Sequence, residues 1–320
     1  MNDRGPNPTP GGLLFIGDPH LASRAPGFRK DEYPRTVLAK LRWAMDYAAE
    51  NKLLPVLLGD LFDFPRDNAN WLLVELLGLF NDGILAVFGN HDCKEDTLGD
   101  NDTLSVLVAA GRVRLLDCDR PWVSTMNGTT VVLGGSCWGQ KLPKSFDRSK
   151  LPPDRPALVF WLAHHDLRFP GYDAGRSDCA EVPGIDAVIN GHIHRRLEDV
   201  VAGSTVWMNP GNIARVARGD ACRDHVPGVL RVDVTPGRWS HQRVAVPHLA
   251  YDEVFHPEVQ AAAAETDQSL FIRELAALQA VRTATGAGLQ VFLDANLPQF
   301  EGPVAAEIRR LASEVLSHGE

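Results

Sequence analysis

Five short apolar runs along the chain each end in a cluster of Asp, Asn or His residues, and this repeated arrangement restricts the fold more than any other feature. The runs are LLFI (13–16), LLPVLL (53–58), ILAVF (84–88), ALVFWLA (157–163) and DAVIN (186–190). The residues that follow them read GDPH, GDLFD, GNHD, HHD and GHIH. Short runs rich in branched and aromatic residues are typical of buried strands. The sequence therefore predicts five strands that carry polar side chains at their carboxyl ends.

A segment with helical periodicity follows each of the first three predicted strands. The segments are YPRTVLAKLRWAMDYAAEN (33–51), ANWLLVELLGLFNDG (69–83) and DTLSVLVAAG (102–111). Strands that alternate with helices indicate an α/β fold. In such folds the functional site lies beyond the carboxyl ends of the strands. We therefore expect the five polar clusters to meet at one edge of the structure.

The polar clusters together contain imidazoles, carboxylates and one amide, which is a donor set suited to two metal ions. The candidates are Asp18, His20, Asp60, Asp63, Asn90, His91, Asp92, His164, His165, His192 and His194. Two neighbouring divalent cations can clamp a phosphate ester and lower the pKa of bound water, so the chemistry needs no nucleophilic side chain. The donor set therefore predicts a hydrolase that acts on phosphate esters.

Read in order over residues 13–212, the motifs D-x-H, GD-x-x-D, GNHD, H and GHxH resemble the signature of the calcineurin-like metallophosphoesterase superfamily. The resemblance implies an α/β sandwich of two mixed β-sheets flanked by helices. It also implies a two-metal centre at the strand ends. The style of the motifs, with GDLFD (59–63) and the glycine turn GGSCWG (134–139), is similar to that of SbcD-type DNA repair nucleases.

The resemblance assigns roles to individual residues. The ligands of the first metal would be Asp18, His20 and His194, those of the second would be Asn90, His164 and His192, and Asp60 would bridge the two. His91 would protonate or stabilise the leaving-group oxygen while a hydroxide held by both metals attacks phosphorus. By analogy with the nucleases we expect two Mn²⁺ ions, with Zn²⁺, Fe or Ni²⁺ as alternatives.

Several neighbours of these residues have open assignments. His164 and His165 are adjacent, and we expect His164 to be the ligand because it comes directly after its strand, while His165 contacts the substrate or a ligand. We expect Asp63 and Asp92 to orient ligating groups through hydrogen bonds, with a turn or capping role as the alternative. Arg195 follows GHIH and is a candidate substrate contact.

Basic residues are concentrated in the loops that follow the predicted site strands. They are Arg24, Arg29, Lys30, Arg35, Lys141, Lys144, Arg148, Lys150, Arg195, Arg196, Arg215, Arg218 and Arg223. They indicate either phosphate contacts or an ordinary solvated surface, and the net charge of −9 argues against broad nonspecific nucleic-acid binding. We predict a nuclease that cleaves DNA by endo or exo action. The alternative is a phosphodiesterase or phosphomonoesterase for small nucleotides, and a non-catalytic scaffold is disfavoured by the intact ligand set.

The chain is expected to be organised as a flexible N-terminus (1–12), a catalytic domain (13–245) and a mostly helical C-terminal accessory region (246–320). The accessory region is interpreted as a cap, a dimer contact or a helix packed on the main domain. A homodimer and a partner ATPase or helicase are therefore both open. The chain lacks an apolar signal segment and a membrane span, and its five cysteines have no regular spacing, which indicates a cytoplasmic protein with reduced thiols and no membrane partner.

Overall fold

A computed structural model of the chain describes residues 10–25, 28–218, 220–256, 297 and 308–310. The chain divides into two compact units, residues 1–256 and 257–320, and everything below concerns the first. Most of the predicted accessory region lies outside the described residues, so its role and the boundary at residue 245 stay predictions. No helix in the described part of the chain is both long enough and apolar enough to cross a membrane.

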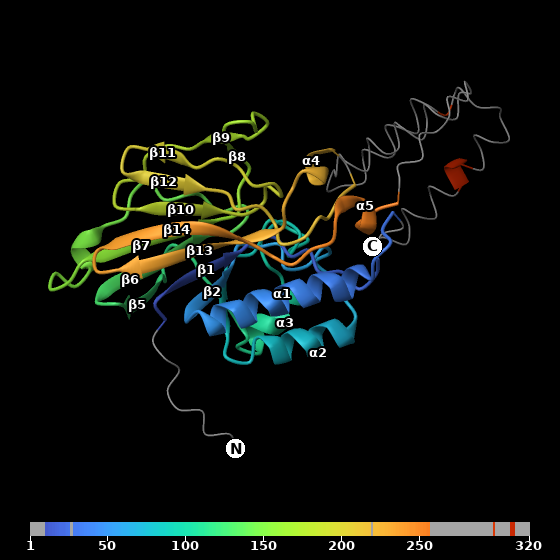
Figure 1. The fold of residues 1–320 in the computed structure, drawn as a ribbon, viewed down its shortest axis with the longest axis horizontal. Helices are drawn as coiled ribbons and strands as arrows, with labels where there is room; N and C mark the ends of the chain where they lie inside the picture. Colours follow the sequence, from blue (N-terminus) through green and yellow to red (C-terminus); the bar gives the residue numbers. More distant parts are fainter. Residues whose placement is uncertain (1–9, 26–27, 219, 257–296, 298–307, 311–320) are drawn as a thin grey trace, which may run out of the picture. The chain divides into compact units, whose positions relative to one another are not determined.

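Two six-stranded mixed sheets form the first unit (Figure 1). The first sheet has the order β14-β13-β1-β2-β3-β4, with β1 (Gly12–Ile16), β2 (Leu53–Leu57), β3 (Ile84–Ala86), β4 (Val113–Leu115), β13 (Gly228–Thr235) and β14 (Arg238–Ala245). The second has the order β11-β12-β10-β7-β6-β5, with β5 (Trp122–Met126), β6 (Thr129–Ser136), β7 (Ala157–Ala163), β10 (Ala187–Asn190), β11 (Val200–Ala202) and β12 (Thr205–Met208). Strands β8 (Leu167–Arg168) and β9 (Ser177–Asp178) pair separately.

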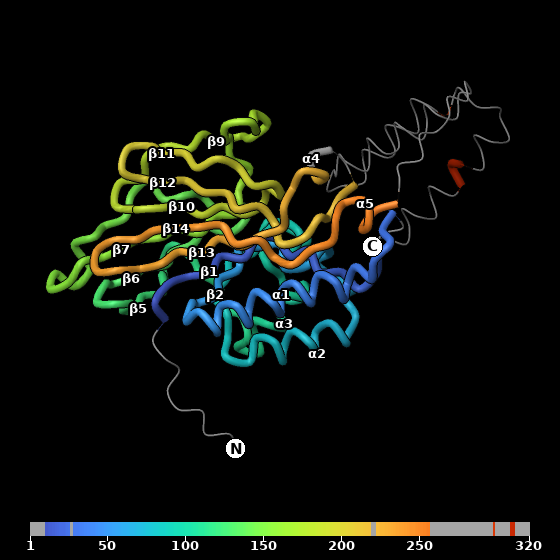
Figure 2. Tube along the Cα trace, viewed as in Figure 1, coloured from blue at the N-terminus to red at the C-terminus, as the bar shows by residue number. Residues whose placement is uncertain are grey.

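The five predicted strands are β1, β2, β3, β7 and β10, and within each sheet those that neighbour one another run parallel. All five residues of β1 are buried, as expected for a strand covered on both faces. The antiparallel hairpin β13–β14 extends the first sheet beside β1, and Figure 2 follows the chain from β12 to this hairpin. The predicted sandwich of two mixed sheets flanked by helices is confirmed.

The three predicted helices are α1 (Tyr33–Glu50), α2 (Asn70–Leu79) and α3 (Thr103–Ala109), and Figure 1 shows them together beside the first sheet. One face of α1 enters the main core through Val37, Leu38 and Leu41. Shorter elements are a 3-10 helix η1 (Arg148–Lys150), α4 (Asp220–Arg223) and α5 (Tyr251–Val254). A second apolar cluster, which includes Trp161 and Trp207, packs between the second sheet and its loops. All five cysteines are free thiols in this structure.

Candidate metal centre

The loops after β1, β2, β3, β7 and β10 bring most of the predicted ligands into one cluster. The cluster contains three groups of three donor residues, and within each group the donor atoms lie within 4.8 Å of one another. The groups are His20 with Asp63 and His91, His20 with Asp60 and His194, and Asp60 with His164 and His192. His20 and Asp60 each belong to two groups, so the three groups are continuous. Residues separated by most of the catalytic region therefore meet because parallel strands end at the same edge.

Asp60 lies at the centre of the cluster, and its carboxylate is almost completely buried. One oxygen, Oδ1, accepts the backbone N–H of His91 at 2.8 Å. The other, Oδ2, lies 3.3 Å from Nε2 of His164 and 3.5 Å from Nε2 of His20. Burial acts to raise the pKa of Asp60, but His164 and His20 outweigh it and hold the pKa below its usual range. The carboxylate is therefore ionised and faces both sides of the cluster, as a bridging ligand must.

Backbone carbonyls orient two of the imidazoles. Nδ1 of His164 lies 2.7 Å from the carbonyl oxygen of Leu58, and Nδ1 of His91 lies 2.8 Å from that of Asp63. A carbonyl oxygen only accepts, so in each ring Nδ1 carries the hydrogen and Nε2 is the free nitrogen. Nε2 of His164 faces Asp60, which is the orientation of a metal-ligating histidine with its second nitrogen held by the protein.

The predicted ligands of the first metal lie close together. Nε2 of His20 lies 2.9 Å from Nε2 of His194. Asp18 is fully buried, and its Oδ1 accepts the backbone N–H of His192 at 3.0 Å. Burial, together with the nearby Asp60 and against the opposing effect of His164, raises the pKa of Asp18 to about 6.

The predicted ligands of the second metal surround the amide oxygen of Asn90. This oxygen lies 2.9 Å from Nδ1 of His192 and 3.3 Å from Nε2 of His164. Burial lowers the pKa of His192 to about 3, and the nearby His164 acts in the same direction. Burial also acts to lower the pKa of His164, but the Asp60 carboxylate outweighs it and raises that pKa to about 9.

Buried polar atoms and backbone strain indicate whether these residues could hold two metal ions. Oδ2 of Asp18 is buried and makes no hydrogen bond with the described residues. Oδ2 of Asp60 and Nδ1 of His20 are also buried, and each has a long polar contact of 3.3 Å, to Nε2 of His164 and to Oδ1 of Asp63. Asp18, His20, Asp60 and His192 also have positive φ angles, between 37° and 73°. Such strain costs about 1–3 kcal/mol per residue and persists where surrounding structure enforces it. Orphaned carboxylate oxygens beside closely spaced imidazoles match the N and O donors of divalent cations, so the residues fit.

The residues with open assignments occupy distinct places. Asp92 is buried and accepts the N–H groups of Phe62 and Gly89 at 3.1 and 3.0 Å, which ties the loop after β2 to the turn after β3. Burial and the nearby Asp60 raise the pKa of Asp92 to about 7. Oδ1 of Asp63 lies 3.3 Å from Nδ1 of His20, so Asp63 contacts a candidate ligand and belongs to one donor group itself.

His165 and Arg195 lie at the margin of the cluster. His165 belongs to none of the three donor groups, and its Nδ1 lies 2.7 Å from the carbonyl oxygen of His164. Its Nε2 is buried and has no hydrogen-bond partner among the described residues. The guanidinium of Arg195 lies over the ring of Tyr172 and donates to the carbonyl of Gly171.

Two buried asparagines support the site, although the sequence analysis did not single out either of them. Asn190, at the end of β10, accepts the N–H of His165 at 3.0 Å and donates to Oδ1 of Asn209 at 3.2 Å. Asn209 in turn donates to the carbonyls of Ile193 and Arg195. The available signal was an asparagine at the end of each of two apolar runs, in DAVIN and NPGN. Neighbouring parallel strands place such residues side by side.

The chain matches a known protein family over more than half of its length. The family model of the calcineurin-like phosphoesterases matches residues 12–196. A search of curated proteins gives no match. Among solved structures, the chain is similar to a hypothetical protein from Thermus thermophilus (12% identity, TM-score 0.39, covering 74% of this chain and 100% of that chain). It is also similar to a predicted phosphoesterase from Streptococcus pneumoniae (14%, 0.34, 75% and 92%) and to purple acid phosphatase PPD1 from yellow lupin, Lupinus luteus (14%, 0.43, 74% and 53%).

Proposed function

Because the chain belongs to the calcineurin-like phosphoesterase family, we propose that it is a metal-dependent phosphodiesterase that cleaves nucleic acid, with DNA as its substrate. Members of this family use divalent metal ions, and the proposed ligands are Asp18, His20, Asp60, Asn90, His164, His192 and His194. When bound, two such ions supply Lewis-acid polarisation of the phosphate and activation of water. Mn²⁺ suits this mixture of imidazole, carboxylate and amide donors, and it is the ion we propose.

Two hollows beside the candidate ligands are the observation that most supports a phosphodiester as the substrate. One, of about 470 Å³, is lined by His192 and His194 together with Tyr172 and Arg195. The other, of about 560 Å³, is lined by Trp138, Lys141 and His165, and by Arg176 with its ion-pair partner Asp166. Each combines an aromatic ring with a cationic side chain, a pairing that suits a nucleobase and its phosphate. A phosphodiester has two organic substituents and a monoester has one, so two hollows favour the diester.

His91 is the proposed proton donor to the leaving group. Its backbone N–H is held by Asp60, and its Nδ1 is held by the carbonyl of Asp63. The first hydrogen bond holds the backbone of His91, and the second orients the ring so that Nε2 is the nitrogen without a hydrogen-bond partner among the described residues. When the ring is doubly protonated, Nε2 can pass its proton to the departing oxygen without the ring having to rotate.

A small-nucleotide phosphodiesterase or phosphomonoesterase is the second candidate, and the charge distribution favours it. Several of the basic residues considered as phosphate contacts bind protein groups instead. Arg29 pairs with Asp31, Arg148 pairs with Asp186, and Arg215 donates to two backbone carbonyls. With a net charge of −9, this leaves fewer cations to follow a long polyanion.

One assay series on the Mn²⁺-loaded protein separates these candidates. It compares linear duplex, single-stranded and closed-circular DNA with bis-p-nitrophenyl phosphate and p-nitrophenyl phosphate. The expected result is DNA cleavage that falls as ionic strength rises and is lost in both Asp60→Ala and His91→Ala. Hydrolysis of the small esters alone would support the second candidate. Cleavage that persists in both variants would identify a contaminating nuclease and remove the support for this proposal.

A further inference from the structure

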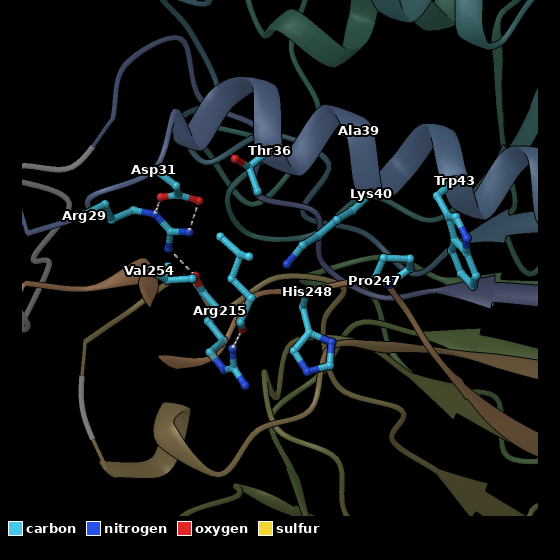
Figure 3. A pocket seen from close by; sticks show the side chains of 11 residues that line it. Arg29, Asp31, Thr36, Ala39, Lys40, Trp43, Arg215, Pro247, His248 and Val254 are labelled. Carbon is cyan, nitrogen blue, oxygen red and sulfur yellow. Dashed lines mark hydrogen bonds and ion pairs between the residues drawn. The ribbon is translucent and has the colours of Figure 1, made fainter. Parts of the chain in front are cut away.

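A separate cavity of about 570 Å³ lies between α1 and the segment 247–254 (Figure 3). It shares no lining residue with the two hollows beside the candidate metal centre. Its volume is within the range of pockets that bind small organic molecules. The cavity is therefore distinct from the candidate metal centre and is large enough for a ligand of its own.

Three cationic side chains line this cavity, and only one of them has a carboxylate partner among the described residues. Nε and Nη2 of Arg29 donate to the two oxygens of Asp31 at 2.8 and 2.9 Å. Arg215 is 7% exposed, and its donors to described residues bind only the carbonyl oxygens of His225 and Leu249, at 3.0 and 2.7 Å. Lys40 makes no hydrogen bond or ion pair within the described part of the chain. After the Arg29–Asp31 pair is subtracted, the cavity carries two uncompensated positive charges.

This charge excess has a physical cost, which is visible in the acidity of Lys40. Burial lowers the pKa of Lys40 to about 8, and the nearby Arg29 and Arg215 act in the same direction. A buried cation without a counter-charge is unfavourable, and an anion bound beside it removes much of that penalty. Within the described residues Arg215 uses two of its five N–H groups, so donors remain there for a ligand. Two uncompensated cations suit a dianion, and a phosphate monoester carries about −1.5 to −2 charges near neutral pH.

Apart from Asp31 and the polar side chains of Thr36 and His248, the rest of the lining is apolar. Trp43, one turn along α1 from Ala39, faces Pro247 at the end of the cavity away from Arg29 (Figure 3). Leu249 and Val254 complete this wall. Inorganic phosphate would leave the apolar surface unused, whereas an organic group attached to the phosphate would cover it.

We propose that this cavity binds an organic phosphate monoester, with the phosphate at Lys40 and Arg215 and the organic group against Trp43 and Pro247. The cavity is independent of the proposed DNA cleavage, because none of its lining residues belongs to the candidate metal centre. The organic group is either a nucleoside or an alkyl chain, since a flat ring and a chain both bury apolar surface against Trp43.

The test is calorimetric titration of the full-length protein, freed of divalent cations so that phosphate has no metal to bind. The probes are adenosine 5′-monophosphate, octylphosphonate and inorganic phosphate, with adenosine and octanol as neutral controls. We expect one of the two organic anions to bind about tenfold or more tightly than inorganic phosphate and than its own neutral control. Which of the two binds identifies the organic group.

Three variants locate the site. Lys40→Gln keeps a side chain of similar length and should weaken organic-anion binding by about tenfold. Trp43→Leu should weaken the organic anion and leave inorganic phosphate unchanged. Arg42→Gln is the matched control, because Arg42 lies on the same helix but pairs with Glu75 outside the cavity. Thermal melting checks that each variant is folded. Absence of saturable binding, or binding that neither Lys40→Gln nor Trp43→Leu weakens, would overturn the proposal.

Discussion

The Nε2 atoms of His20 and His194 lie 2.9 Å apart, although 174 positions separate the two residues in the sequence. Oδ2 of Asp60, which has no hydrogen-bond partner among the described residues, lies 3.5 Å from the same Nε2 of His20. Without a cation, one of the two rings must donate a hydrogen bond to the other, whereas a divalent cation would accept the lone pairs of all three atoms at once. This convergence is the strongest single reason to expect a metal ion on this side of the cluster.

Metal removal should therefore destabilise the protein, and Asp60→Asn should abolish the effect. A ligand present at 100 times its Kd stabilises a fold by about 2.7 kcal/mol, which corresponds to roughly 5–10 °C in a protein of this size. We expect Mn²⁺ to raise the Tm of the metal-free wild type by about this amount, and the variant to show little shift. Differential scanning fluorimetry together with elemental analysis measures both. An equal shift in the variant would exclude Asp60 as a ligand.

His91→Asn should lower kcat without removing metal. Loss of a general acid costs about 10²–10⁴-fold in rate, and the cost rises when the leaving group is a poor one. The defect should therefore be larger on a diester with an alkoxide leaving group, such as a dinucleotide, than on bis-p-nitrophenyl phosphate, whose leaving group needs little protonation. The measurement is kcat on both substrates.

Metal content is the control for the His91 variant. It should match the wild type, because Nε2 of His91 is proposed to face the substrate. A rate loss of equal size on both substrates would argue that His91 positions the other groups and does not donate a proton.

The strand ends were predictable because a buried strand must be apolar and must then stop. The runs before Asp18, Asp60 and Asn90 contain almost no polar residue, so the first polar side chains after them mark the edge of the sheet. The same reasoning favours His164 over His165 only because His164 comes first after the strand, and it gives no contact that distinguishes the two. The carbonyl of Leu58, which follows β2 of the other sheet, is what orients Nε2 of His164 toward Asp60.

The binding partners of the basic side chains in these loops could not be predicted from the sequence either. An arginine in a loop is compatible with solvent, with a phosphate or with a protein partner. Arg29 pairs with Asp31 only two positions away and lies over the rings of Tyr33 and Phe255. Phe255 belongs to a segment more than two hundred residues further along the chain, so no local pattern could indicate this contact.

Gly89→Ala should disable the metal centre and leave the rest of the fold in place. A Cβ at Gly89 would come within 2.1 Å of Oδ1 of Asp60 and 2.6 Å of Nε2 of His164. Because both neighbours are candidate ligands held by other contacts, we expect metal affinity to fall. Gly78→Ala is the matched control: Gly78 lies in α2 with nothing near its Cβ position, and alanine there should stabilise the helix by about 0.5–1 kcal/mol.

The readouts for the glycine pair are metal affinity and denaturant unfolding, measured on both variants. A Gly89→Ala protein that binds Mn²⁺ as tightly as the wild type would show that the loop after β3 can move aside. The candidate ligands would then be less constrained than their contacts indicate.

His225 should make the stability of the fold depend on pH. It is 6% exposed, and it donates from Nε2 to the carbonyl of Asn212 at 2.9 Å, while Asn212 donates its own N–H to the carbonyl of His194. Burial lowers the pKa of His225 from its ordinary value of 6.5 to about 4. Between these values the unfolded chain binds more protons than the folded one, so His225 stabilises the fold above pH 6.5 and this contribution is lost as pH falls toward 4. From pH 7 to pH 5 the loss is about 2 kcal/mol.

The matched variant for this effect is His225→Gln, which retains a donor for the carbonyl of Asn212 but does not titrate. Its free energy of unfolding, measured with urea from pH 7 to pH 5, should fall by about 2 kcal/mol less than that of the wild type. Parallel pH profiles in the two proteins would mean that His225 is protonated as readily in the folded chain as in the unfolded one.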